Sequence, residues 1–454
     1  MKQRPIHQEL IVKTEKIVHG GQALARADRF VVFVDDALPN ETVRAKLYKK
    51  KKQFAFARAI EVLEAAPERI PSDCAWTGDC GGCTFRHCTY EAQLGYKKQI
   101  LVEALHGLPE AQALVQEVVP SSQTNDYRNK MVFSFGETLD GEFRLGLHRR
   151  GSFIHIVPAN NCLLQSETSR EIVRRIVLLA QELDIPPFHE IKKTHGLRQL
   201  TIREGRNTRQ RMVELVTTQA YPGLEERLRE VLDDLADTLL LSLDTNLQGM
   251  PRPGYRQLLK GNGVIEETLN GLRFRIGPDT FFQSNTAQAE RLFARLQEWA
   301  VQNARPAIAL DLFAGTGPIA LHLAGLAERV IGVENWPPSV EAANENLALN
   351  GIHNVEMVAA DVNDALPPFM PAHADLVVVD PPRPGLSPDA IDWINRLTPD
   401  RLIYVSCNPS TLARDLKLFL QRAPYRVEAV EPFDLFPNTF HLETLVVLQR
   451  TIHS

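Results

Sequence analysis

A regular alternation of apolar runs and helical segments, beginning near residue 271, is the feature that most constrains the fold of this chain. Such alternation predicts a doubly wound α/β sheet, in which most strands are parallel and helices cover both faces. Ligands of these sheets bind outside the carboxyl ends of the strands, so we expect the chemistry at that edge. The seven runs expected as strands are 308–313, 329–334, 355–361, 375–380, 402–407, 425–430 and 442–449.

A glycine-rich turn, DLFAGTG (Asp311–Gly317), follows the first of these strands. Glycines allow the backbone to approach a ligand closely. Glu334 ends the next strand about 20 residues on, where an acid that binds ribose hydroxyls is expected, and Asp361 ends the third. The turn and the two acids predict a nucleotide site. The pattern differs from the G-x-G-x-x-G dinucleotide motif because Pro318 and Ala320 occupy the later positions.

Cys407 lies where another buried strand opens into a loop. Pro409 cannot continue a central strand, and we expect Ser410 or Thr411 to cap a helix that starts near Leu412. Free cysteines are commonly buried and inert, so a structural thiol is the simpler interpretation of Cys407. Its place at the carboxyl edge of the sheet also suits a nucleophile.

The direction of the final strand bears on this choice. If that strand is antiparallel, Glu443 at its start lies at the same edge as Cys407 and Asp380. A thiol and a carboxylate at one site fit covalent catalysis by a thiolate with a separate base. For Glu443 alone, a strand-end carboxylate facing water is the simpler interpretation. A catalytic role is therefore predicted only if Cys407, Glu443 and Asp380 lie together at one edge of the sheet.

Residues 1–66 alternate short β-like runs with turns, which predicts a small β-barrel. The first 70 residues contain 14 lysines and arginines against 9 acids, although the net charge of the whole chain is −5. Any RNA contact must therefore come from local basic patches. The densest patch is Lys49–Lys52, beside Phe54 and Phe56. Lysines next to aromatic rings can bind phosphates and bases, although a solvated hairpin tip also explains such a run.

Residues 67–270 are expected to form a central α+β unit that begins with a cysteine cluster. Cys74, Cys80 and Cys83 form C-x5-C-x2-C, and three neighbouring thiolates are costly to bury without a cation. A closed site needs a fourth ligand, and Cys88 and Cys162 are both available. Zinc ligands usually come as two close pairs, so a triplet with a remote fourth cysteine favours an iron–sulfur cluster over zinc.

The composition predicts a soluble cytoplasmic protein with no membrane contact. Hydrophobic residues make up 44% of the chain, yet no apolar run approaches the roughly 18 residues needed to span a bilayer. No signal segment is seen. Cysteines in that compartment are expected to bind metals or to catalyse rather than to form disulfides.

A helix is expected over 91–105, with Lys97 and Lys98 on a solvated face.

Together these residues resemble the RNA 5-methyluridine methyltransferases over nearly the whole chain. Residues 1–66 are similar to a TRAM domain through Gly20–Gly21, Ala37–Pro39 and Thr42–Val43, although Asn40 stands where a glycine is common. The other motifs that support the resemblance are FFQSN (Phe281–Asn285), DLFAGTG (Asp311–Gly317), VVVDPPRPGL (Val377–Leu386), YVSCNPSTLARDL (Tyr404–Leu416) and FPNTFHLETLVVL (Phe436–Leu448).

The resemblance implies a multidomain architecture. Residues 1–66 would form the OB-like TRAM barrel, which binds RNA, and residues 67–270 the central α+β domain with an iron–sulfur site. Residues 271–454 would form the doubly wound, Rossmann-like class I methyltransferase domain. The expected partners are RNA alone, with no obligate protein partner and a monomeric enzyme.

The resemblance also implies the chemistry. The enzyme would transfer a methyl group from S-adenosylmethionine to C5 of a uridine in RNA, with Cys407 bonding covalently to C6 and Glu443 removing the C5 proton. Many relatives have a polar residue at Pro318, so one cofactor contact differs here. The residues that would bind the cofactor and the uracil are Gln283, Phe313, Glu334 and Asp380, with Asp361 as a further acid of the cofactor site. The ligands of a four-iron (4Fe-4S) cluster would be Cys74, Cys80, Cys83 and Cys162.

Three alternatives stay open. A barrel with a cluster favours 23S ribosomal RNA as the substrate, but transfer RNA is modified by relatives with the same catalytic motifs. A small-molecule or protein methyltransferase would need no pair like Cys407 and Glu443. A non-catalytic RNA-binding or redox-sensing protein would use the barrel and the cluster without transferring any methyl group.

Overall fold

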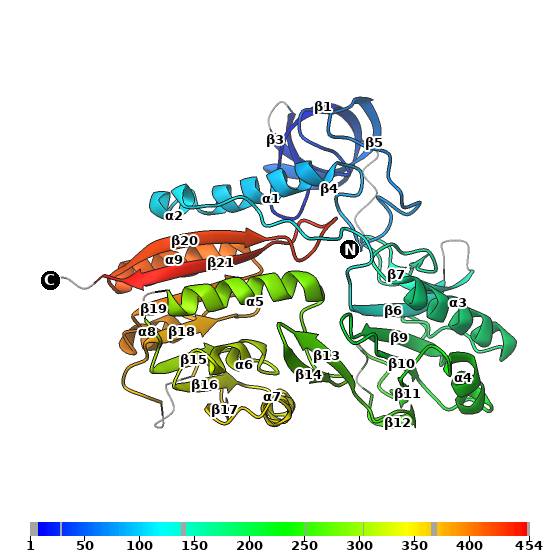
Figure 1. Cartoon of the computed structure of the whole chain (residues 1–454). Helices are drawn as coiled ribbons and strands as arrows, with labels where there is room; N and C mark the ends of the chain where they lie inside the picture. Colours follow the sequence, from blue (N-terminus) through cyan, green and yellow to red (C-terminus); the bar gives the residue numbers. More distant parts are fainter. Residues whose placement is uncertain are drawn as a thin grey trace.

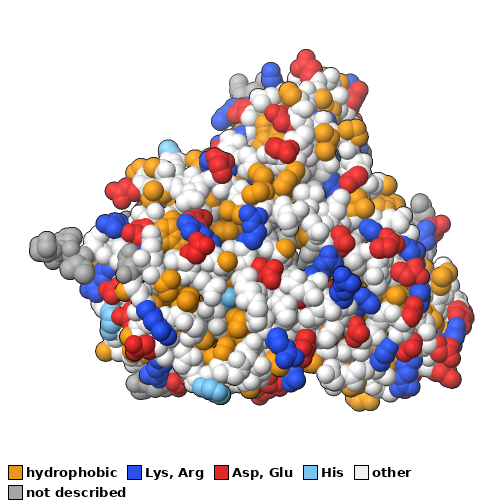
Figure 2. Space-filling view, in the orientation of Figure 1, with side chains coloured by type: hydrophobic (Ala, Val, Ile, Leu, Met, Phe, Trp, Pro, Cys, Tyr) orange, Lys and Arg blue, Asp and Glu red, His pale blue; other side chains and the backbone are white. Residues whose placement is uncertain are grey.

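The computed structural model describes residues 8–27, 30–137, 142–249, 251, 253–302, 304–364 and 370–451. Residues 1–7 and 452–454, with which the first and last expected domains begin and end, lie outside the described residues. Figure 1 shows a barrel, a central sheet with helices and a C-terminal sheet with helices on both faces. Figure 2 shows basic and acidic side chains interspersed over the visible face, as the small net charge implies.

The N-terminal strands close into a barrel, which confirms the prediction for this part of the chain. Its interior is lined by small and β-branched residues such as Val12, Ala25 and Val34. Lys49 lies over the ring of Phe56, with its ammonium 5.6 Å from the ring centre. The strands, in barrel order, are β1 (Glu9–Ile17), β2 (Ala23–Ala27), β3 (Phe30–Asp35), β5 (Phe54–Glu64) and β4 (Thr42–Lys50).

The central sheet has seven strands and is covered on one face by helices α3 (Glu167–Glu182) and α4 (Leu224–Leu232). Apolar residues of both helices, such as Ile172 and Leu228, pack with Leu200 of the sheet in one buried cluster. The strands, in sheet order, are β12 (Tyr255–Lys260), β11 (Thr238–Leu243), β10 (Arg211–Thr217), β9 (Leu197–Glu204), β6 (Lys130–Glu137), β7 (Phe143–His148) and β8 (Ile156–Pro158).

The C-terminal sheet also has seven strands, as predicted. Strands such as Leu376–Val379 are apolar at every position because both of their faces are buried. The last strand runs antiparallel to both of its neighbours, which confirms the expected direction. The order is β17 (Val355–Ala359), β16 (Arg329–Glu334), β15 (Ile308–Leu312), β18 (Leu376–Val379), β19 (Arg401–Ser406), β21 (Glu443–Arg450) and β20 (Tyr425–Phe433).

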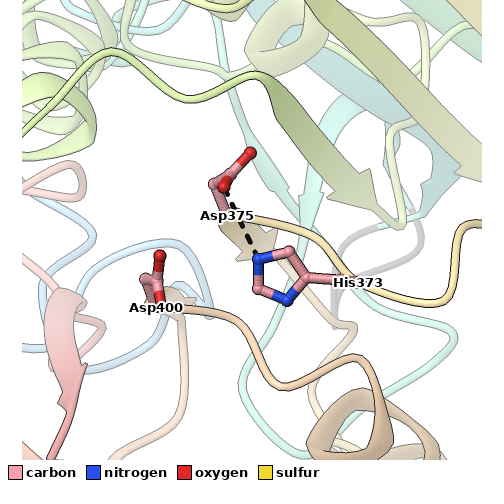
Figure 3. Close-up of side chains that lie close together, drawn as sticks. All are labelled: His373, Asp375 and Asp400. Carbon is pink, nitrogen blue, oxygen red and sulfur yellow. Dashed lines mark ion pairs between the residues drawn. The ribbon is translucent and has the colours of Figure 1, made fainter. Parts of the chain in front are cut away.

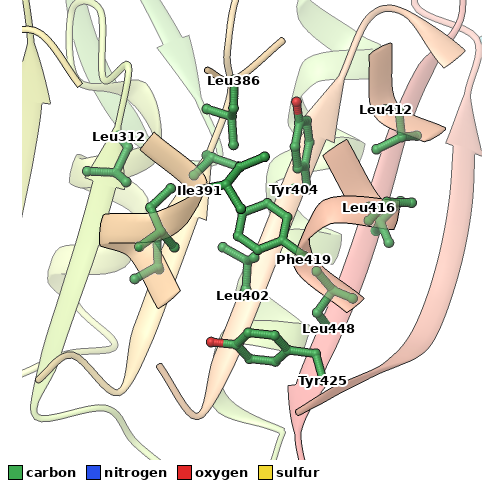
Figure 4. Packing of buried hydrophobic residues seen from close by; sticks show 14 of the residues in the cluster. Leu312, Leu386, Ile391, Leu402, Tyr404, Leu412, Leu416, Phe419, Tyr425 and Leu448 are labelled. Atoms are coloured by element: carbon green, nitrogen blue, oxygen red, sulfur yellow. The ribbon is translucent and has the colours of Figure 1, made fainter. Parts of the chain in front are cut away.

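Helices cover both faces of this sheet. On one face, α8 (Pro388–Arg396) and α9 (Pro409–Arg422) bury Ile391 and Phe419 against Leu402 and Tyr404 of β19 (Figure 4). The other face packs against α5 (Thr286–Val301), α6 (Pro318–Ala324), α7 (Pro337–Leu349) and the hairpin of β13 (Ile265–Leu269) and β14 (Leu272–Ile276). None of the helices within the described residues is long and apolar enough to cross a membrane.

Two segments from the range expected for the central unit, 67–270, lie on the C-terminal sheet. Helix α1 (Tyr90–Ala104) places Leu101 in the same buried cluster as α8 and α9, and α2 (Pro109–Ala113) contributes Ala111. Strand β13 packs with α5 on the opposite face. The structural unit around this sheet therefore extends beyond residues 271–454.

Lys97 corrects one sequence-based expectation. Its side chain is fully buried, and its ammonium lies 2.5 Å from a carboxylate oxygen of Asp434. The same ammonium donates to the carbonyl of Phe436, and Tyr90 donates to the second oxygen of Asp434. The pair joins α1 to the loop between β20 and β21, so the expectation of a solvated face was wrong for Lys97.

We expect Lys97→Met to destabilise the protein strongly because it leaves the Asp434 carboxylate buried without its cation. Breaking such a pair from one side costs about 3–5 kcal/mol. Lys98→Met is the matched control, since its ion pair with Glu117 is exposed and is worth below about 1 kcal/mol. Urea unfolding followed by tryptophan fluorescence measures both. Equal midpoints for the two variants would contradict the assignment.

Candidate active site

The predicted site residues line the carboxyl edge of the C-terminal sheet in strand order. Each of the parallel strands ends there, and β21 begins there because it runs the other way. Neighbouring strands are about 4.8 Å apart, so residues on adjacent strands can act on one ligand. Along the edge from β17 to β21, the residues are Asp361, Glu334, Phe313, Asp380, Cys407 and Glu443.

The register of β19 and β21 places Cys407 beside Glu443. Ser406 pairs with Thr444, so the pairing continued by one residue sets Cys407 opposite Glu443. Side chains directly opposite on antiparallel strands have β-carbons about 5 Å apart. Helix α9 begins immediately afterwards at Pro409, with the Asn408 side chain as its cap. The helix therefore starts earlier than the predicted Leu412, because an asparagine provides the cap.

Burial dominates the electrostatics of this group. Burial, followed by the carboxylates of Glu443 and Asp380, raises the pKa of the half-buried Cys407 thiol to about 12. Glu443 is buried, and burial together with Asp380 raises its pKa well above the ordinary value. The pKa of Asp380 is raised by burial to about 7. With neither substrate bound, the thiol is therefore protonated at neutral pH.

Arg383 is the cation of the site, and the sequence patterns did not single it out. It follows Asp380 in the D-P-P-R segment and lowers the pKa of both Cys407 and Glu443. Its guanidinium lies 3.4 Å from Nε2 of His441. Within the described residues, Arg383 has no carboxylate within ion-pair distance. An arginine three residues after a strand-end aspartate, in the loop at the carboxyl edge of the sheet, was the available signal.

The glycine turn after β15 is joined to the next strand through Glu334. One carboxylate oxygen of Glu334 accepts from the backbone N–H of Gly315 at 3.0 Å, and the other accepts from Trp336 at 2.9 Å. Phe313 adopts a φ of 66°, which is costly for a residue other than glycine and is characteristic of functional sites. Gly317 has a φ of 82°, in the left-handed region that favours glycine, so this turn requires glycine.

Asp311 provides a test of whether the turn fits S-adenosylmethionine. Its side chain is fully buried; Oδ2 accepts from the N–H of Ala320, and Oδ1 has no partner. Burial raises its pKa to about 8, with Asp380 and Glu334 adding to the effect. A cationic ligand would compensate these three acids, and a β-carbon placed on Gly315 would meet no atom within 4 Å. The residues present fit a positively charged nucleoside.

Asp311 was missed as a separate site residue because it lies within the glycine motif.

Gln283 lies near this turn, whereas Asp361 lies two strands away along the sheet edge. Gln283 is buried just before α5, and its carbonyl accepts from the Asn129 side chain of the central unit. Thr316 of the glycine turn donates to the carbonyl of Phe281, which places the FFQSN segment against the turn. Asp361 lies two residues beyond β17 and accepts from the N–H of Asn363.

The structure also brings four cysteines together. Burial, together with the nearby thiols of Cys83, Cys162 and Cys74, raises the pKa of Cys80 to about 11. Cys162 comes from the loop after β8, whereas the other three lie within one segment. Cys88 is buried elsewhere and donates its S–H to the carbonyl of Phe85. The structure thus separates Cys88 from the group, which spacing could not do.

Two arginines face this cysteine group. Nε of Arg86 lies 3.4 Å from the sulfur of Cys83, and Asp73 and Asn125 hold the rest of its guanidinium. Nε of Arg128 is buried without a hydrogen-bond partner. Burial lowers the pKa of that guanidinium, but Tyr127, followed by Cys83 and Cys162, raises it. An unpartnered buried donor and two cations fit a group of bound thiolates with net negative charge.

A separate cluster lies at the opposite edge of the sheet. His373, Asp375 and Asp400 come from the segments that precede β18 and β19 (Figure 3). Nε2 of His373 is 3.5 Å from Asp375, and Asp375 also accepts from the N–H of Ile308. These contacts account for the cluster as a local ion pair, remote from Cys407.

Comparisons with known proteins agree with this geometry. The tRNA (uracil-5-)-methyltransferase family matches residues 370–451, and the TRAM domain matches residues 7–60. An uncharacterized RNA methyltransferase of Thermotoga maritima is 35% identical over 97% of this chain and 98% of its own. This chain belongs to the S-adenosylmethionine-dependent RNA (uracil-C5) methyltransferases. A relative from Halalkalibacterium halodurans is 32% identical over 99% of both chains.

A solved structure supports the same family. Pyrococcus abyssi tRNA (uracil-54, C5)-methyltransferase, crystallised in complex with S-adenosyl-L-homocysteine, is 26% identical to this methyltransferase. The structural match covers 96% of this chain and 99% of the Pyrococcus chain, and its TM-score is 0.77. The resemblance inferred from the motifs is therefore confirmed at the level of the family, the barrel and the methyltransferase fold.

We expect Asp380→Asn to speed alkylation of Cys407 by iodoacetamide at pH 9. Asp380 is ionised there because its pKa is about 7, so its removal lowers the pKa of the thiol and raises the thiolate fraction. Arg383→Gln should slow the reaction by losing the opposite charge. Effects of roughly threefold or more are expected for charges this close. Mass spectrometry of the Cys407 peptide measures the rates, and equal rates in all three proteins would contradict this electrostatic account.

Proposed function

We propose that this methyltransferase modifies C5 of a uridine in RNA through a covalent bond between Cys407 and C6 of the uracil. The placement of Cys407 opposite Glu443 supports the proposal most directly. C5 and C6 are adjacent ring atoms, so a nucleophile for one and a base for the other must lie within a side-chain length of each other. Direct transfer to nitrogen or oxygen would need no such pair.

Each group has one step in the proposed reaction. The Cys407 thiolate adds to C6, and the electrons of the C5–C6 double bond make C5 enolate-like and nucleophilic. The glycine turn and Glu334 would hold S-adenosylmethionine, whose sulfonium would supply the methyl group. The new bond to C5 would form as the S–CH3 bond breaks, and neutral S-adenosylhomocysteine would leave. Glu443 then takes the proton from C5, the double bond re-forms, and the thiolate leaves.

The charges of the site favour this order of reaction steps once both substrates are bound. The positive charge of Arg383 lowers the pKa of both Cys407 and Glu443 and so partly offsets the effect of burial. Thiolates form near neutral pH only where nearby positive charge stabilises them. A sulfonium bound near Asp311 and Asp380 would add that charge. The three acids would in turn favour a positively charged methyl donor over its neutral product.

Two RNAs are candidate substrates. The barrel and the cysteine cluster underlie our proposal of 23S ribosomal RNA. The whole-chain likeness to an archaeal tRNA (uracil-54, C5)-methyltransferase favours transfer RNA as the second candidate. In either case the target uracil must leave its stack, which costs a few kcal/mol and favours a loop or a strained region.

We also propose that Cys74, Cys80, Cys83 and Cys162 bind a four-iron cluster. No three of their sulfurs lie within 4.8 Å of one another. Tetrahedral zinc with Zn–S bonds of about 2.3 Å would hold its sulfurs about 3.8 Å apart. A larger metal group with bridging sulfides suits the wider spacing. Arg86 and Arg128 would offset its negative charge, and its role here is structural.

RNA that contains 5-fluorouridine should form a stable adduct with the wild-type enzyme and S-adenosylmethionine, because fluorine cannot leave C5 as a cation. We expect the adduct with a 23S rRNA transcript and none with a tRNA transcript; the reverse pattern would assign tRNA. Cys407→Ala should abolish the adduct. Glu443→Gln should accumulate a methylated adduct even on ordinary RNA, since the C5 proton stays in place. Denaturing gel electrophoresis detects both.

The control is Cys88→Ala, since this buried cysteine lies outside both sites. It should form the adduct as the wild-type enzyme does. An enzyme that methylates RNA but forms no adduct with 5-fluorouridine would refute the covalent mechanism.

Anaerobically purified protein should show the broad visible absorbance of an iron–sulfur cluster. We expect Cys162→Ser to lose this absorbance and to release iron, whereas Cys88→Ser keeps both. Iron and sulfide analysis completes the measurement. Colourless protein with one zinc per chain would overturn the cluster assignment.

A further inference from the structure

The turn between β1 and β2 of the barrel touches the loop that leads into Glu443. The ring of His19 lies 5.6 Å from that of Phe440 in an edge-to-face arrangement. A β-carbon on Gly21 would lie 2.4 Å from Thr84 and 3.3 Å from Phe440. Gly21 also has a φ of 82°, so glycine is required there twice over. The barrel therefore contacts the loop before β21 directly.

A continuous chain of contacts leads from this turn to Arg383. The rings of Phe440 and His441 contact each other in a tilted arrangement, with ring centres 4.2 Å apart. Nε2 of His441 lies 3.4 Å from the Arg383 guanidinium, which can only donate, so this nitrogen accepts and His441 positions the arginine. His19 and Arg383 are both exposed. The charge of Arg383 acts on His19 of the barrel as well as on Cys407 and Glu443, so Arg383 lies near both the barrel turn and the catalytic pair.

We infer that Arg383 and His19 form a binding site for a backbone phosphate next to the target uridine. This inference rests on the proposed function, because a uracil held between Cys407 and Glu443 remains joined through its ribose to two phosphates. When the base swings into the site, those phosphates stay outside at its entrance. An exposed guanidinium without a carboxylate partner is the group best suited to bind one, in a bidentate manner.

The two residues bind the phosphate differently. His19 is exposed, but partial desolvation and the nearby charge of Arg383 lower the pKa of its imidazole, which is therefore neutral at pH 7 and donates a hydrogen bond without charge. Burial, followed by Arg383, lowers the pKa of His441 to about 4, so it stays neutral and acts on Arg383 as an acceptor. Arg383 therefore provides the charge of the site. His19 provides a second contact that comes from the barrel.

Equilibrium binding of a short fluorescent oligouridylate to the full-length protein, over a range of salt concentrations, tests this assignment. Each phosphate contact with a cation adds about 0.7 to the slope of log affinity against log salt for single strands. Arg383→Gln should reduce the slope by that amount and weaken binding about tenfold. Arg383→Lys should keep the slope. His19→Ala should weaken binding several-fold at an unchanged slope.

Arg329→Gln is the matched control, because Arg329 is an exposed arginine at the opposite edge of the sheet. It should leave both affinity and slope as in the wild-type protein. An unchanged slope in Arg383→Gln would overturn the inference and leave Arg383 acting on Cys407 alone. An unchanged affinity in His19→Ala would remove the barrel from the site. Oligouridylate binding requires no methyl transfer, so this test stands apart from failure of the proposed function.

Discussion

The pairing of β21 between β19 and β20 is the constraint on which the candidate active site depends. Since β21 runs antiparallel, its first residue, Glu443, meets the edge where the parallel strands end. A parallel strand in the same place would carry Glu443 to the opposite edge, near Asp375 and Asp400. The direction of one strand thus decides whether Cys407 has a carboxylate partner.

The loop before β21 is held from outside the sheet. Lys97 of α1 pairs with Asp434 at one end of the loop. In its middle, the carbonyl of Asn438 accepts from the N–H groups of Thr84 and Phe85, directly after the cysteine segment. These contacts connect the cysteine group to the position of Glu443. They give a physical reason for the structural role that we propose for a metal group at these cysteines.

Much of this arrangement could be predicted from local sequence patterns. Apolar runs and glycine turns identified the seven strands and the barrel because these signals lie within each segment. The order of the strands could not be predicted, since an apolar run does not specify its neighbours. Lys97 was misassigned because its partner Asp434 lies 337 residues away. Arg383 and Asp311 lie inside motifs, and only their burial and partners distinguish them from neighbouring residues.

Tritium release tests the central claim most directly. An RNA substrate labelled with tritium at C5 of uridine and incubated with S-adenosylmethionine should release one tritium to water for each methyl group incorporated. Glu443→Gln should incorporate methyl groups without that release, because the proton at C5 is not removed. Methyl incorporation by the wild-type enzyme without tritium release would place the methyl group elsewhere than C5 and contradict the account.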